Sequence, residues 1–170
     1  MPSFISFIPT PPEYTDGFFE VAPLSASDVV YDLGSGDGRL LFAALDNGAG
    51  KAVGVELNSK LVNEARETAR SKGLEDRITF LEADVMEVSL ADASVVLCYL
   101  STSASAALKP KFESELAPGT RVVMETFPVP GWKPVQTVDK RGRQFYLYTM
   151  PPEPGEEHPA SNMDFDLGWW

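Results

Sequence analysis

Residues 29–39 read VVYDLGSGDGR, and this stretch decides the fold of the chain. An apolar, β-branched run enters a loop with glycine at every second position, and the apolar stretch LLFAAL follows at 40–45. This order is typical of a strand, a tight turn and the start of a helix, which together form a nucleotide-binding turn. The alternative is a strand-to-helix turn whose glycines serve geometry alone.

The other residues of the loop indicate which nucleotide it binds. The dinucleotide fingerprint G-x-G-x-x-G would need a third glycine where Arg39 stands, and no Lys followed by Ser or Thr completes a P-loop. Asp32 ends the strand and Asp37 lies in the loop, where a pyrophosphate would need positive potential. Two carboxylates disfavour a phosphate and favour a cation. S-adenosylmethionine, which carries a sulfonium and an ammonium and has no phosphate, fits this loop.

Residues 32–38, DLGSGDG, resemble motif I of the seven-strand, S-adenosylmethionine-dependent methyltransferases. The resemblance implies an α/β fold with a doubly wound, mostly parallel seven-strand sheet that is closed by a C-terminal antiparallel hairpin. It also implies that the loop binds the cofactor through five residues: Asp32, Gly34, Ser35, Gly36 and Gly38.

A second apolar run, at residues 51–56, ends in a carboxylate. Glu56 lies about 20 residues past the glycines, the spacing at which a carboxylate binds ribose hydroxyls in βαβ nucleotide folds. We therefore expect Glu56 and the adjacent Leu57 to bind the cofactor. A surface or helix-capping glutamate is the alternative.

The adenine end of the cofactor is expected after a third strand at residues 77–81. In the family that the chain resembles, an acidic residue at this place accepts a hydrogen bond from the exocyclic amine of adenine, and Asp84 matches it. The Val85 amide would hold the ring. The alternative for Asp84 is a helix N-cap.

The beginning of the chain is apolar and then proline-punctuated, which predicts an extended arm that leads into a helix at 12–21. This arm either caps the cofactor pocket, with Phe7 and Thr10 facing it, or only covers the sheet. Thr10 is therefore included among the expected cofactor-binding residues.

The methyl acceptor is expected near two further strands, at residues 93–100 and 121–127. Ligands of open α/β sheets bind beyond the carboxyl ends of the strands, which places Tyr99 and Glu125 at the acceptor site. Tyr99 either orients the incoming amine and contacts the cofactor or is a core aromatic. Glu125 takes the amine's proton, binds its ammonium form or belongs to a structural ion pair. These two are the predicted catalytic residues.

The rest of the chain is expected to form scaffold. Patterns predict a helix from Asn58 to about residue 72, a helix at 103–116 that Pro110 breaks or kinks, and a hairpin of strands at 135–138 and 144–149. The predicted methyltransferase domain spans residues 1–150. Residues 151–170 form a proline-rich, acidic tail that is either a flexible extension or docks through its terminal tryptophans, Trp169 and Trp170. We assign no role to His158, which lies in this tail.

Composition limits the partners and the compartment. The 170 residues carry a net charge of −11, which disfavours a nucleic-acid substrate and favours a basic protein or a cationic small molecule, unless the charge serves solubility alone. No apolar run is long enough for a membrane span, and the start lacks the features of a secretory signal. With a single cysteine, Cys98, this predicts a cytoplasmic or other intracellular protein. No metal site is predicted, and the sequence leaves the oligomeric state open.

Several stretches together resemble the small archaeal protein lysine methyltransferases and the related mitochondrial lysine methyltransferases, up to about Met150. Phe7 departs from the tyrosine expected there. The resemblance implies in-line transfer of a methyl group to a neutral lysine amine, which an aromatic, apolar channel favours by lowering the pKa of that amine. A small-molecule methyltransferase and a non-catalytic S-adenosylmethionine-binding module are the alternatives. The stretches that carry the resemblance are 9–11, 29–39, 52–56, 108–111, 115–123 and 131–132.

Overall fold

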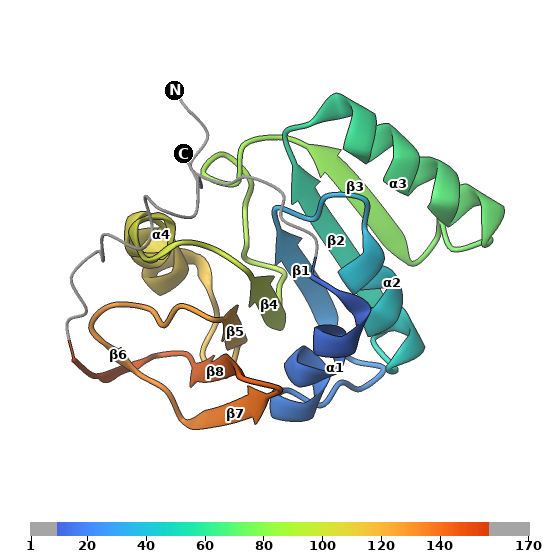
Figure 1. Cartoon of the computed structure of the whole chain (residues 1–170). Helices are drawn as coiled ribbons and strands as arrows, with labels where there is room; N and C mark the ends of the chain where they lie inside the picture. The colour runs from blue at the N-terminus through green and yellow to red at the C-terminus, as the bar shows by residue number, and fades with distance from the viewer. Residues whose placement is uncertain (1–9, 157–170) are drawn as a thin grey trace.

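A computed structural model describes residues 10–156 of the chain (Figure 1). The helices are α1 (Pro12–Val21), α2 (Arg39–Asp46), α3 (Ser59–Ser71) and α4 (Thr102–Glu115). The strands are β1 (Val29–Leu33), β2 (Lys51–Glu56), β3 (Ile78–Glu82), β4 (Val95–Cys98), β5 (Arg121–Glu125), β6 (Trp132–Lys133), β7 (Gln136–Lys140), β8 (Arg143–Thr149) and β9 (Glu153–Pro154).

The main sheet has seven strands in the order β3-β2-β1-β4-β5-β8-β7. The first five run parallel, and β8 and β7 join them as an antiparallel hairpin. The chain moves outward from β1 to β3 and then returns to β4 beside β1, so the order reverses at the β1–β4 pair. This arrangement confirms the predicted fold class. Ligands of open α/β sheets bind where the strand order reverses, so the arrangement predicts a ligand site at the carboxyl ends of β1 and β4.

Two apolar layers cover the sheet. One face packs against α1, α2 and α3 through side chains such as Phe18, Leu41 and Val62. The other face packs against α4 through Leu108 and Phe112. The central strands are apolar almost throughout because both of their faces are covered. The sequence pattern therefore determines the layers directly.

The helix boundaries follow from local chemistry. The side chain of Asn58 accepts hydrogen bonds from the amides of Lys60 and Leu61, as the sequence predicted for a cap of α3. Helix α4 begins one residue earlier than expected, and it continues through Pro110 without a break. Proline has no amide hydrogen, so the Ala106 carbonyl accepts no helical hydrogen bond from Pro110. Both residues lie on the exposed face of the helix, where water can replace that bond.

A second, two-stranded sheet was not predicted. Strand β9 pairs antiparallel with β6, and the Gly155 amide donates to the Gly131 carbonyl at 2.9 Å. A side chain at Gly155 would meet the Trp132 backbone at 2.5 Å, so only glycine allows this approach. The expected tail thus begins against the domain, while Phe7, His158, Trp169 and Trp170 lie outside the described residues, and the boundary at residue 150 stays a prediction.

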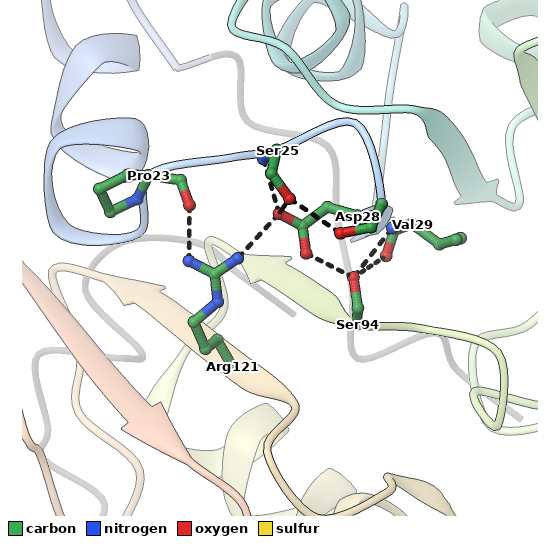
Figure 2. Close-up of polar contacts among 7 residues, drawn as sticks. Pro23, Ser25, Asp28, Val29, Ser94 and Arg121 are labelled. Carbon is green, nitrogen blue, oxygen red and sulfur yellow. Dashed lines mark hydrogen bonds and ion pairs between the residues drawn. The ribbon is translucent and has the colours of Figure 1, made fainter.

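A polar network fastens the amino ends of the central strands (Figure 2). Asp28, just before β1, accepts from Arg121 of β5 at 3.0 Å, from Ser94 before β4 at 2.8 Å and from the Ser25 amide at 2.8 Å. Arg121 also donates to the Pro23 carbonyl at 2.6 Å. The network joins the α1–β1 connection to β4 and β5 at the edge of the sheet opposite the candidate site.

Candidate active site

Three polar or aromatic positions meet where the central strands end. The strand register places Leu33 beside Cys98 and Cys98 beside Met124. The residues that follow are the 34–38 loop, Tyr99 and Glu125, the last residue of β5. They therefore lie at the same edge of the sheet, where the parallel strands end. Cys98 itself is fully buried in the core, as expected.

Glu56 holds the glycine loop. Its carboxylate accepts from the Gly36 amide at 3.0 Å through Oε1 and from the Asn58 amide at 2.9 Å through Oε2. The Gly34 and Ser35 amides donate to the Val55 carbonyl at 2.8 and 3.0 Å. The end of β2 thus orders the loop, and each carboxylate oxygen still has a second lone pair for a ribose hydroxyl.

Two glycines permit close packing under this loop. Gly38 has a φ of 85°, and a Cβ there would lie 2.6 Å from the Phe80 ring. A Cβ on Gly54 would lie 2.6 Å from the Ser35 hydroxyl, which is buried and has no hydrogen-bond partner within residues 10–156. The Ser35 side chain therefore lies beneath the loop, against β2.

Asp32 gives the site its charge preference. Burial, together with the nearby carboxylates of Glu56 and Glu125, raises the pKa of Asp32 to about 8. Arg39 stands where the dinucleotide fingerprint needs a glycine. Its guanidinium forms an ion pair with the Asp37 carboxylate at 2.8 Å. The carboxylates of Asp32, Glu56 and Glu125 converge on one edge of the sheet and favour a cationic ligand. The residues present therefore fit S-adenosylmethionine, whose amino-acid end carries an ammonium.

The expected adenine side lies after β3. The Asp84 carboxylate accepts from the Met86 amide at 2.9 Å, within a turn at residues 85–87. No helix begins at this turn, so the contact is not the helix N-cap that was the alternative for Asp84. Val85 is buried, whereas Leu57 and Met86 are 43% and 48% exposed and are available to a planar ligand.

Helix α4 holds the loop that carries Asp84. Lys111 donates to the Met86 carbonyl at 3.3 Å and to Glu115 at 2.6 Å, and Glu115 accepts from the Leu90 amide at 2.9 Å. Two side chains of one helix thus fix both ends of the segment from Met86 to Leu90.

The acceptor side is built around an ion pair. Glu125 is fully buried, and its two oxygens accept from Thr10 Oγ1 at 3.0 Å and from Arg143 Nη1 at 2.5 Å. The guanidinium carbon of Arg143 lies 4.2 Å from the Tyr14 ring centroid and 5.6 Å from that of Tyr99. Burial raises the pKa of Glu125, and the bonds from Arg143 and Thr10 oppose the shift.

The structure gathers most of the predicted residues into two neighbouring groups, while Leu57, Asp84 and Val85 follow the ends of β2 and β3. The loop, Asp32 and Glu56 form one, and Thr10, Tyr99 and Glu125 form the other. The described hydrogen bond of the Thr10 side chain joins it to Glu125 rather than to the loop. The roles assigned to all of these residues stay predictions.

Sequence reasoning did not find Arg143 or Tyr14. Arg143 opens a hairpin strand and Tyr14 lies in the first turn of α1, and neither belongs to a motif. Within residues 10–156, no three metal-ligating side chains gather to hold an ion. The helices of that same range include none that is both long and apolar enough to cross a membrane.

Comparison with known proteins identifies the family of the chain. The family model of the ANTKMT methyltransferase domain matches residues 32–136. A protein-lysine N-methyltransferase of Saccharolobus islandicus is 40% identical over 151 residues, which cover 86% of this chain and 94% of the relative. The adenine nucleotide translocase lysine N-methyltransferase of Mus musculus is 39% identical over 119 residues, 70% of this chain and 52% of the relative. The chain thus matches nearly all of the archaeal relative and about half of the mouse one.

A solved structure gives the same fold with a different description. The crystal structure described as an RNA methyltransferase from Salinibacter ruber, in complex with S-adenosyl-L-homocysteine, has a TM-score of 0.82 and 38% identity. The match covers 88% of this chain and 98% of that one. It supports S-adenosylmethionine as the cofactor of this chain.

Proposed function

The chain belongs to the S-adenosylmethionine-dependent protein-lysine N-methyltransferase family, and from this premise we propose that it methylates lysine side chains of a basic protein. One observation carries the proposal: three carboxylates and two tyrosines converge where β1, β2, β4 and β5 end. The carboxylates suit a cationic cofactor. The acceptor amine is expected beside it, at the ends of β4 and β5. The archaeal relative, which the chain matches over almost its whole length, supports lysine as that amine.

The mechanism is chiefly one of positioning. S-adenosylmethionine would supply the methyl group from its sulfonium, and its sulfur would leave as the neutral thioether of S-adenosylhomocysteine. Glu56 and the loop would hold the ribose, Asp32 the ammonium, and Asp84, Val85 and Leu57 the adenine. Tyr99 would orient the acceptor amine beside the ends of β4 and β5. Holding nucleophile and methyl group in line accounts for most of the rate without a strong base.

We also propose that the target is basic and that the reaction takes place inside the cell. The net charge of −11 favours a basic partner, and Cys98 is a free, buried thiol, as is common in reducing compartments. Methylation of RNA is the second candidate because of the Salinibacter structure. The same negative charge opposes an RNA backbone.

The test is to incubate the protein with methyl-labelled S-adenosylmethionine and a cell extract, and then to treat samples with protease or nuclease. Label that protease releases and that hydrolyses to methyl-lysine supports the proposal. Nuclease-sensitive label would support the RNA candidate, and label only in small molecules would support a small-molecule enzyme. Cofactor binding without any label would indicate a binding module.

Glu56→Ala supplies the internal control for this assay. Loss of its hydrogen bonds to a ribose and to the loop should weaken S-adenosylhomocysteine binding by about 10- to 100-fold, as measured by calorimetry. Glu64→Ala removes an exposed carboxylate of α3 and should leave binding unchanged. Equal affinities in the two variants would contradict the role of Glu56.

A further inference from the structure

Arg143 is the only cation that the described contacts place against Glu125, and none of the assigned roles uses it. Its guanidinium bonds to Glu125 of β5 and lies against the faces of Tyr14 of α1 and Tyr99 after β4. These contacts hold an arginine side chain in one place at the expected acceptor site.

The ion pair is oriented. The Glu125 side chain has no exposed surface, whereas 29% of the Arg143 side chain is exposed. The negative end therefore lies inside the protein and the positive end faces the solvent. Both Glu125 oxygens already accept hydrogen bonds, one from Arg143 and one from Thr10. An amine on the solvent side of this ion pair therefore lies nearer the guanidinium than the carboxylate.

We propose that Arg143 selects the neutral form of the acceptor amine, an inference that rests on the proposed lysine methylation. A fixed cation repels a lysine ammonium and leaves the neutral amine unaffected. The amine releases its proton to water before transfer. Its lone pair then forms the C–N bond while the C–S bond of the cofactor breaks, and the methylated ammonium product is again repelled, which favours its release.

The other charged groups around Arg143 set the size of the effect. Glu125 offsets part of the positive charge. Asp32, whose pKa is raised to about 8, adds negative charge from β1 only when high pH or a bound cation ionises it. Burial raises the pKa of Tyr99, so that side chain stays neutral below pH 10. A unit charge roughly 10 Å away, at an effective dielectric constant of about 20, shifts a pKa by about one unit, and the partial offset reduces this to between about half a unit and one unit.

The first test is the pH dependence of kcat at saturating lysine peptide. Arg143→Gln should move the acid limb of the profile up by about half to one pH unit, because the bound amine then holds its proton more tightly. Arg143→Lys keeps the charge and should keep the limb in place. Arg141→Gln removes an exposed cation of the same hairpin and is the matched control, with an unchanged profile expected.

The second test measures protonation without turnover. A peptide with a ¹³C-dimethylated lysine is titrated by NMR while bound to the protein with S-adenosylhomocysteine. The lysine pKa should lie below that of the free peptide in the wild-type complex and return toward it with Arg143→Gln. If that variant fails to fold, Arg143→Met, which keeps the unbranched stem beside Tyr14, carries the same expectation.

The outcomes separate this inference from the proposed function. A wild-type protein that methylates lysine, with the same acid limb and bound-lysine pKa in the glutamine variant, would overturn the role of Arg143 alone. A rate that falls equally at every pH in Arg143→Gln and Arg143→Lys would assign Arg143 to structure only. A wild-type protein without any lysine activity would overturn both.

Discussion

Asp32 lowers the stability of the free protein at high pH and favours the binding of a cationic ligand. Burial and two neighbouring carboxylates raise its pKa to about 8 in the folded protein, whereas an unfolded chain has an ordinary value near 3.8. Between these values the folded state binds a proton that the unfolded state does not, so the free energy of unfolding falls as pH rises from about 4 to about 8. Only a cationic ligand favours the ionised form.

Asp32→Asn should remove this pH dependence. At pH 8.5 the free variant should melt at a higher temperature than the wild type, and near pH 4.5 the two should melt at similar temperatures, because Asn resembles the protonated carboxyl. Calorimetry should show weaker S-adenosylmethionine binding by the variant above pH 8. Parallel melting profiles over this range would show that Asp32 is ionised in the free protein.

At the scale of elements, the turn between β1 and α2 depends on close contact with β3. Gly38→Ala requires an alanine at φ 85° and a Cβ 2.6 Å from the Phe80 ring. Gly73→Ala, after α3, is the matched control, because its φ of 66° carries a similar backbone cost and nothing lies within 4 Å. The control should lose about 1 kcal/mol of unfolding free energy in urea titrations.

Gly38→Ala should lose a further 1–3 kcal/mol, roughly, since the ring must move, and it should also bind the cofactor less tightly. Equal losses in the two variants would mean that Phe80 yields without cost.

The amino ends of the strands should affect stability without affecting chemistry. Burial alone would raise the pKa of Asp28, but the bonds from Ser25, Ser94 and Arg121 outweigh it and lower the pKa. The stabilisation is therefore present above about pH 4 and is lost as pH falls through the lowered folded value. Asp28→Asn should reduce the unfolding free energy by about 1–3 kcal/mol at pH 7 and leave kcat unchanged. A changed kcat would contradict the separation of this network from the carboxyl ends of the strands, where the candidate site lies.

At the scale of the whole molecule, the sequence predicted what depends on local order. The glycine loop, the Glu56 spacing and the apolar strands lie in short stretches. The sheet could therefore be predicted and candidate cofactor residues could be named, whose binding roles stay predictions. The contacts of Arg143 with Tyr14, Tyr99 and Glu125 require α1, β5 and β8 to pack together. No periodicity within any of these elements indicates a partner in the others. The β6–β9 pair could not be predicted for a related reason, because two-residue strands have no recognisable sequence pattern.

The net charge of −11 also belongs to the whole molecule, and it leads to a prediction about acceptors. Long-range attraction to a basic protein weakens as salt shortens the screening length from about 14 Å at 50 mM to about 6 Å at 300 mM. The KM for a basic protein acceptor should therefore rise several-fold over this range. The kcat should stay nearly constant, because the site carboxylates Asp32, Glu56 and Glu125 are buried and weakly screened.

A short, uncharged peptide around the same lysine serves as the control for this salt series, and its KM should change by less than about twofold. Steady-state assays of both acceptors at matched pH make the comparison. If the KM of the basic protein stays constant, recognition depends on close contacts at the ends of β4 and β5, and the acidic surface then contributes to solubility instead.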